Sequence, residues 1–261
     1  MPPQPGQRSD LRTVIAVAIL AYAASSVVHE LIGHGSGCLL TGVKAVSVTS
    51  ILLQSAGGNR VVDVSGPVAN VLFGTGAFLF FRRQAKFTAF SYFLWFFAAL
   101  NLLVATGYIF YSGITNWGDW ASVIRGLRPQ YAWRTVISLA GILLYLGVVR
   151  LLCRSIIKLV RVGEVRRSDV RRLIYPAYFT CGLLAVASAA FNPVSPRLIW
   201  VNGFSGSFLA FLGLLRIPSI VDQYATETHE GKPIPFSPTW VTAGALVAIV
   251  FIFVFGPGIR L

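Results

Sequence analysis

Residues Val14–His34 read VIAVAILAYAASSVVHELIGH, a mostly apolar run that ends in two histidines with a glutamate between them. A membrane-spanning helix needs about 20 predominantly apolar residues, and this run supplies them. Acidic and imidazole groups are costly inside such a segment, so they mark a functional site by default. The stretch therefore predicts a first membrane span with candidate site residues His29, Glu30 and His34 at its end.

The composition extends this interpretation to the whole chain. Of the 261 residues, 55% are hydrophobic and only 12% are charged, whereas soluble domains average about 25% charged residues. The sequence predicts an all-α polytopic membrane protein with six or seven transmembrane helices. The expected spans are residues 12–32 (extending toward Leu40), 66–82, 87–113, 136–160, 173–191, 198–217 and 239–256.

The basic residues indicate topology rather than a partner. The net charge of +13 comes from Lys and Arg in short connectors, where they orient the spans and contact anionic lipid headgroups. This placement argues against nucleic-acid binding. The largest cluster, in residues 150–172, places the N-terminus in the cytoplasm, and we expect a plasma or inner cell membrane. Residues 1–11 are polar and proline-rich, which predicts a disordered cytoplasmic N-terminus.

Residues 43–65, between the first two spans, have a different character. VKAVSVTSI alternates in part, GGN is a turn signal, and RVVDVS alternates again. The pattern predicts a β-hairpin insert, whose free edge could accept an extended peptide. A plain extracytoplasmic loop fits the same residues.

Two further polar features lie near the spans. Gly66, Pro67 and Asn70 stand at the head of the second span, and Asp119 follows the third span in the segment NWGDW. With the N-terminus in the cytoplasm, both features lie at the membrane level where His29–His34 leaves the first span. The topology therefore predicts that they gather at one site.

These residue types suit a zinc hydrolase. Zinc takes imidazole nitrogens and a carboxylate as ligands and keeps one position open for water. The metal lowers the pKa of that water, and a neighbouring glutamate takes its proton. We expect His29, His34 and Asp119 to be ligands of Zn²⁺ and Glu30 to be the catalytic base that activates a zinc-bound water.

The spacing of the histidines sets a structural condition on this site. The usual zinc motif has two histidines four residues apart on one helical face, whereas His29 and His34 are five apart. At about 100° per residue, five steps of an α-helix separate the side chains by about 140°. A π-bulge absorbs the extra residue, and the glycines at 33, 35 and 37 favour such a distortion. Alternatively Glu30, four residues before His34, is itself a ligand.

The chain resembles the site-2 protease family of intramembrane zinc metalloproteases, especially its small bacterial-type members. The resemblance rests on HELIGHGSGCLLTG, on SGPVANVLFG and on GDW at Asp119, in that order. It implies a metalloprotease core over residues 12–125, made of three helices and the hairpin, followed by additional transmembrane helices in 126–261. It also implies cleavage of a transmembrane segment of another membrane protein. Asn70, with Gly66 and Pro67, would then lie near the substrate.

Other functions stay open on the sequence. A catalytically inactive relative would use the same fold to bind or chaperone membrane proteins. The segment Gly203-Phe204-Ser205-Gly206 resembles the serine motif of rhomboid proteases, but the only later histidine, His229, lies in a polar stretch, and small residues also serve close helix packing. A proton-relaying transporter is a third class. No oligomeric state is indicated.

Overall fold

The computed structural model describes residues 8–225 and 231–261. In these residues, seven helical segments are long and apolar enough to cross a membrane. The chain is therefore an all-α, multi-pass membrane protein with one small sheet. Of residues 1–11, which were predicted to be disordered, residues 1–7 lie outside the described ranges. Ser9 is instead buried and bonded to Asp169, and Asp10 caps the first helix, which begins at Leu11. The seven segments are Leu11–Thr41, Arg60–Arg82, Ala89–Thr115, Gln130–Arg161, Arg167–Ala189, Ile199–Tyr224 and Pro238–Phe255.

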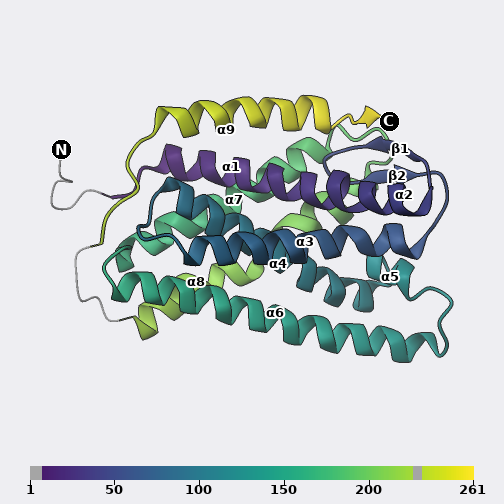
Figure 1. The fold of residues 1–261 in the computed structure, drawn as a ribbon, viewed down its shortest axis with the longest axis horizontal. Coiled ribbons are helices and arrows are strands. Elements are labelled where there is room, and N and C mark those ends of the chain that lie inside the picture. The colour runs from purple at the N-terminus through teal and green to yellow at the C-terminus, as the bar shows by residue number, and fades with distance from the viewer. Residues whose placement is uncertain (1–7, 226–230) are drawn as a thin grey trace.

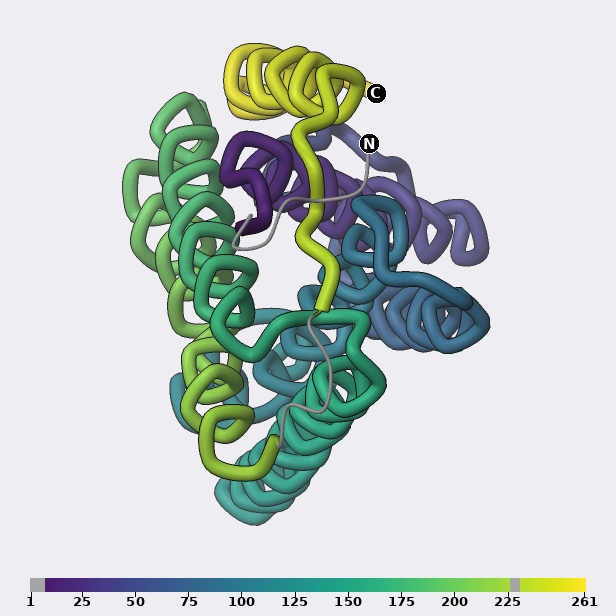
Figure 2. Tube along the Cα trace, turned by 90° about the vertical axis from the view of Figure 1, so that its left-hand side faces the viewer, coloured from purple at the N-terminus to yellow at the C-terminus, as the bar shows by residue number. Residues whose placement is uncertain are grey.

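The helices run roughly side by side along the long axis of the molecule (Figure 1). Helix α4 (Ala89–Thr115) lies at the centre, and α6 (Gln130–Arg161) and α9 (Pro238–Val250) lie on opposite sides of the bundle (Figures 1 and 2). The core joins the buried faces of α1 (Leu11–Val27), α4 and α7 (Val170–Ala189). The aromatic side chains of Tyr92, Trp95 and Phe96 fill its centre.

The first span is not a uniform α-helix. Helix α1 passes directly into the π-helical segment η1 (Val28–His34) and then into the short helix α2 (Gly35–Thr41). Gly42 ends α2 in a left-handed conformation with φ 68°, which glycine adopts without steric cost. The predicted extension of this span toward Leu40 is confirmed.

A three-stranded antiparallel sheet follows at one end of the bundle. Strands β1 (Ala45–Val48) and β2 (Leu53–Ser55) form the predicted hairpin, and β3 (Ile259–Arg260), at the other end of the chain, pairs with the second edge of β1. Figure 1 shows the strands beside α2 and the C-terminus. One edge that was expected to be free is therefore covered by the chain itself.

The predicted extent of the hairpin, residues 43–65, is wrong at its second half. Residues Arg60–Ser65 are helical, because α3 begins at Arg60 and continues to Arg82. The Asn59 side chain caps this helix by accepting a 2.8 Å hydrogen bond from the backbone N–H of Val61, a function that asparagine serves well at a helix start. The hairpin turn lies at residues 49–52, not at GGN.

The remaining elements complete the bundle. Helix α5 (Asp119–Val123) follows α4, and the short 3₁₀ segment η2 (Arg167–Asp169) precedes α7. The sixth span combines the π-helical segment η3 (Ile199–Leu209) with α8 (Leu212–Tyr224), and the seventh combines α9 with η4 (Phe251–Phe255). Most exposed apolar side chains, such as Leu72, Leu143 and Leu183, stand on the outer faces of these helices, as expected for surfaces in contact with lipid.

Candidate metal centre

The π-helical geometry of η1 brings the two histidines of the first span together. A π-helix repeats its hydrogen bonds from residue i to i+5, so residues five apart lie on the same face. His29 and His34 accordingly approach each other with 3.3 Å between their Nε2 atoms. The structural condition set by the spacing is therefore met.

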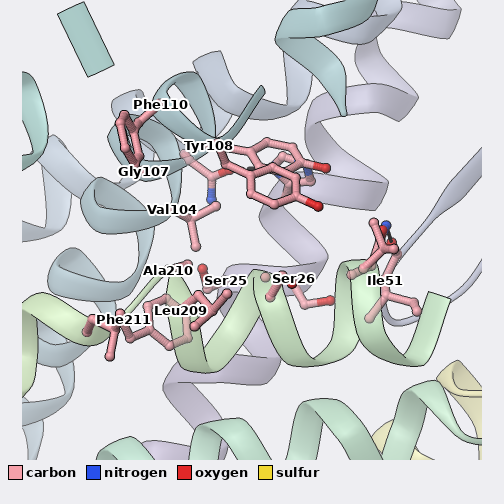
Figure 3. A pocket seen from close by; sticks show the side chains of 18 of the residues that line it. Ser25, Ser26, Ile51, Val104, Gly107, Tyr108, Phe110, Leu209, Ala210 and Phe211 are labelled. Atoms are coloured by element: carbon pink, nitrogen blue, oxygen red, sulfur yellow. Dashed lines mark hydrogen bonds between the residues drawn. The ribbon is translucent and has the colours of Figure 1, made fainter. Parts of the chain in front are cut away.

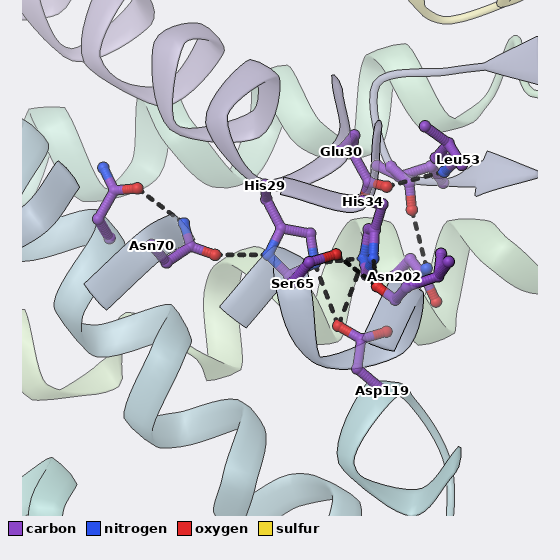
Figure 4. Close-up of polar contacts among 11 residues, drawn as sticks. His29, Glu30, His34, Leu53, Ser65, Asn70, Asp119 and Asn202 are labelled. Atoms are coloured by element: carbon purple, nitrogen blue, oxygen red, sulfur yellow. Dashed lines mark hydrogen bonds and ion pairs between the residues drawn. The ribbon is translucent and has the colours of Figure 1, made fainter. Parts of the chain in front are cut away.

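Asp119 reaches the two histidines from the start of α5 (Figure 4). Its Oδ2 atom lies 3.2 Å from Nε2 of His29 and 3.6 Å from Nε2 of His34. The chain turns sharply before it, because Asn116 ends α4 with φ 57° and Gly118 has φ 89°. These backbone conformations favour asparagine and glycine. The segment NWGDW thus returns Asp119 to the first span.

The hydrogen bonds of the two imidazoles leave their Nε2 lone pairs facing Asp119. Nδ1 of His34 lies 2.7 Å from the carbonyl oxygen of Val62. A carbonyl only accepts, so the neutral ring carries its proton on Nδ1 and leaves Nε2 free. For His29, the position of the ring proton follows from a longer chain of hydrogen-bonded groups.

Two asparagine side chains, Asn101 and Asn70, fix the proton of His29. Asn101 donates from Nδ2 to the carbonyl oxygen of Phe97 at 2.8 Å and accepts at Oδ1 from Nδ2 of Asn70 at 2.7 Å. The amide oxygen of Asn70 therefore faces Nδ1 of His29, at 2.5 Å. His29 must donate from Nδ1, which again leaves Nε2 with a lone pair. Partners of this kind orient metal-binding histidines.

A cation fits between the three ligand atoms. Oδ2 of Asp119 is buried and accepts no hydrogen bond from the described residues. In the neutral rings no proton separates it from the two Nε2 atoms, so His29, His34 and Asp119 form a group that could hold a metal ion. Burial alone would raise the pKa of Asp119, but the two imidazoles beside it hold that pKa well below its usual range.

Glycines let α3 approach the π-helical segment closely. A Cβ atom on Gly33 would lie 2.6 Å from Cα of Gly66, which is closer than real Cβ contacts allow. A Cβ atom on Gly66 would lie 2.5 Å from Nε2 of His34 and 3.0 Å from Cε1 of His29. Gly66 thus lies flat against both rings. Pro67 is buried inside α3 and is not among the residues that line the cavity beside the site.

Glu30 is held apart from the three-atom group. Its Oε2 atom accepts a 2.8 Å hydrogen bond from the backbone N–H of Leu53 in β2, and the side chain is buried. The hairpin therefore fixes one carboxylate oxygen of Glu30 near the two histidines (Figure 4). Glu30 is not among the residues whose ligand atoms converge.

A cavity of about 470 Å³ opens beside His29 and Glu30. It lies between α1, α4, α6 and η3, and Figure 3 shows Tyr108 and Val104 of α4 on one wall and Leu209 and Ala210 on another. Aromatic and aliphatic side chains form most of its surface. The polar lining residues besides His29 and Glu30 include Ser25, Ser26, Ser50, Asn70, Asn202 and Ser205.

The hairpin turn is anchored by helices from the second half of the chain. Asn202 of η3 donates from Nδ2 to the carbonyl oxygen of Ile51 at 2.9 Å, and the backbone N–H of Ser50 donates to the carbonyl oxygen of Phe255 at 2.8 Å. Ser26 of α1 donates to the carbonyl oxygen of Ser50 at 2.6 Å. The turn is thus fixed within the protein, and its backbone groups are satisfied as a low-dielectric environment requires.

The serine of the rhomboid-like segment lies in η3. Oγ of Ser205 donates to the carbonyl oxygen of Trp200 at 3.0 Å, within the same π-helical segment. Ser205 lines the cavity, whereas His229, the histidine expected to pair with it, lies outside the described residues. The structure places no hydrogen bond between Ser205 and either His29 or His34.

No protein-family model, curated protein or solved structure matches this chain. The class of protein is defined by its own fold and site. The chain is a multi-pass membrane protein with a partly buried His–His–Asp group able to hold a metal ion at the edge of an apolar cavity.

Proposed function

We propose that this protein is an intramembrane zinc metalloprotease that hydrolyses a peptide bond in or near a transmembrane segment of another membrane protein. The observation that carries the proposal is the convergence of His29, His34 and Asp119 at a π-helical turn. Their ligand atoms are separated by 3.2, 3.3 and 3.6 Å. Tetrahedral zinc, with bonds of about 2.0–2.1 Å, separates its ligands by about 3.3 Å.

Two histidines and a carboxylate also hold iron in some oxygenases, so metal analysis decides between the two ions. The lack of a thiolate among the three ligands fits a hydrolytic site with one open position.

The residues around the site suit peptide hydrolysis. Bound zinc would lower the pKa of a water molecule and polarise the scissile carbonyl. Glu30 takes the proton of the attacking water and delivers it to the leaving amine nitrogen. The Leu53 N–H holds one carboxylate oxygen of Glu30, so the other oxygen is available for the proton.

The surroundings support a membrane-embedded substrate. The site lies next to a largely apolar cavity between helices that are exposed to lipid on their outer faces, a setting in which an apolar peptide is favoured over a soluble one. The order of the three motifs resembles that of the site-2 protease family. By the same proposal the N-terminus is cytoplasmic and the protein resides in the plasma or inner cell membrane.

Metal analysis of purified protein tests the ligands. We expect about one zinc per chain in the wild type and little in His29→Ala and Asp119→Ala. Asp63→Asn is the matched control, because this acid of α3 lies outside the three-atom group. Absence of zinc from wild-type protein prepared without chelators would overturn the site.

A second assay separates a protease from an inactive relative. Reporter proteins with one transmembrane segment are reconstituted with the protein in liposomes, and their cleavage is followed. Glu30→Gln should keep zinc and lose cleavage, since the amide oxygen can still accept from Leu53 but cannot take a proton. If wild-type protein holds zinc, binds the reporters and cleaves none, the protein is instead a binding relative.

A further inference from the structure

The hydroxyl group of Tyr108 stands without a partner beside the metal ligands. Tyr108 belongs to α4 and lines the same cavity as His29 and Glu30 (Figure 3). Among the described residues, none forms a hydrogen bond with its Oη atom. The side chain is half-buried on the cavity wall, so its hydroxyl group is available to a ligand bound in the cavity.

Tyr108 lies close to two of the three proposed ligands, His29 and Asp119. Its ring meets the His29 ring edge to face, with 6.1 Å between the ring centres. A Cβ atom on Gly118 would lie 2.9 Å from Oη of Tyr108, so the hydroxyl lies against the backbone that directly precedes Asp119. Stacking on Tyr111, at 5.9 Å and 9° between the rings, restricts the orientation of the phenol.

Peptide hydrolysis needs a hydrogen-bond donor at such a position. When water adds to the scissile carbonyl, the carbonyl oxygen gains negative charge, and donors aimed at it lower the barrier. Oγ of Ser50 and Nε1 of Trp120 also lack a partner among the described residues, but Tyr108 is the donor whose ring packs against His29. Other donors around the site are engaged: Asn70 donates to Asn101, and Ser65 donates to the carbonyl oxygen of Val62. Ser26 likewise donates to the carbonyl oxygen of Ser50.

We propose that Tyr108 is a further catalytic residue, whose hydroxyl donates a hydrogen bond to the oxyanion of the tetrahedral intermediate. The inference rests on the proposed function. The water oxygen bonds to the carbonyl carbon, and the electron pair of the C=O double bond moves to the carbonyl oxygen, which Tyr108 stabilises while keeping its proton. As the double bond re-forms, the C–N bond breaks, and the amine nitrogen takes the proton held by Glu30.

The assignment changes the function of Asn70. Its place near the second span suggested a polar group close to the substrate. In the structure its oxygen orients His29 and its amide nitrogen donates to Asn101, so we assign the oxyanion contact to Tyr108.

Ligand binding to cobalt-loaded protein tests the proposal apart from turnover. The probe is acetohydroxamate, a small anion whose oxygens mimic the developing charge. Tyr108→Phe should retain one Co²⁺ per chain with an unchanged visible spectrum, and bind acetohydroxamate about tenfold to hundredfold more weakly, the worth of one hydrogen bond to a charged group. In the reporter assay its kcat should fall about 100-fold with KM unchanged.

The control is Tyr131→Phe, which removes a hydroxyl from an exposed side chain that does not line the cavity and should leave both measurements unchanged. Equal acetohydroxamate binding by Tyr108→Phe and wild type, or no binding to cobalt-loaded wild type, would overturn the assignment while the metal site stands. Failure of wild-type protein to bind metal at all would instead overturn the proposed function, and the inference with it.

Discussion

Gly66 lies flat against the imidazole of His34, so close that a Cβ atom at this position would stand 2.5 Å from Nε2. The same Cβ atom would lie 3.0 Å from Cε1 of His29. The backbone of α3 thus forms the floor beneath both histidines. A methyl group at residue 66 would overlap the ring of His34, whose Nε2 atom faces Asp119.

We expect Gly66→Ala to weaken metal binding. The new methyl group must displace the ring of His34, and loss of ligand orientation typically lowers metal affinity about 10-fold to 100-fold. Overpacking against the π-helical segment should also cost about 1–3 kcal/mol of stability. Competition with a chelator of known affinity measures the first effect, and thermal unfolding measures the second.

Gly76→Ala is the matched control in the same helix. No atom lies within 4 Å of a Cβ atom built there, and Gly76 is exposed. Metal affinity should equal that of the wild type, because the added methyl group meets only lipid or solvent. If both variants lost metal equally, the loss would reflect a general perturbation of α3 and not contact with the histidines.

Much of this architecture could be predicted from residue patterns. Long apolar runs mark the spans because a membrane-spanning helix must be apolar. The five-residue spacing of His29 and His34 predicted a π-helical turn if both side chains bind one metal. The prediction for residues 60–65 was wrong because the alternation of Val62, Asp63 and Val64 fits a strand, whereas the cap at Asn59 starts a helix. Local alternation and a helix start are hard to separate over six residues.

The supporting residues of the site were missed for a different reason. Asn101 lies within the third span, where a polar side chain is itself a signal, but nothing in the sequence pairs it with Asn70. Tyr108 has no such signal in a helix rich in Tyr and Phe. The anchoring of the hairpin by Asn202 depends on tertiary contacts between residues about 150 positions apart, which no local pattern encodes.

Asn70→Ala should weaken metal binding about 10-fold to 100-fold. Without the amide oxygen, Nδ1 of His29 loses its acceptor, and the ring is free to rotate or to move its proton to Nε2. Asn101→Ala should have a smaller effect, because Asn70 keeps its oxygen beside His29 and loses only the partner that holds the amide in place. Chelator competition ranks the three proteins.

A contrary result at Asn70 would be informative. If Asn70→Ala kept wild-type metal affinity and only raised KM for the reporter, Asn70 would serve the substrate, as the resemblance to site-2 proteases implies. The orientation of His29 would then depend on the π-helical backbone alone.

Asn202→Ala tests whether the second half of the chain positions Glu30. Nδ2 of Asn202 holds the carbonyl oxygen of Ile51, two residues before Leu53, whose N–H holds Glu30. Loss of the first bond should cost about 1–2 kcal/mol of stability and lower kcat about tenfold through misplacement of the base. Metal content should not change, since no ligand depends on the hairpin. Unchanged kcat would show that Glu30 is positioned without this anchor.

Ser205→Ala should leave proteolysis and metal content at wild-type levels. A serine nucleophile needs an adjacent base, and the two described histidines have both ring nitrogens engaged with Asn70, Val62, Asp119 and each other. The hydroxyl of Ser205 only bonds to the carbonyl oxygen of Trp200, so its loss should change stability by less than about 1 kcal/mol.

The reporter assay is run with and without 1,10-phenanthroline and with a fluorophosphonate. Inhibition by the chelator alone supports the metal mechanism, whereas loss of cleavage in Ser205→Ala together with fluorophosphonate labelling would identify a serine protease.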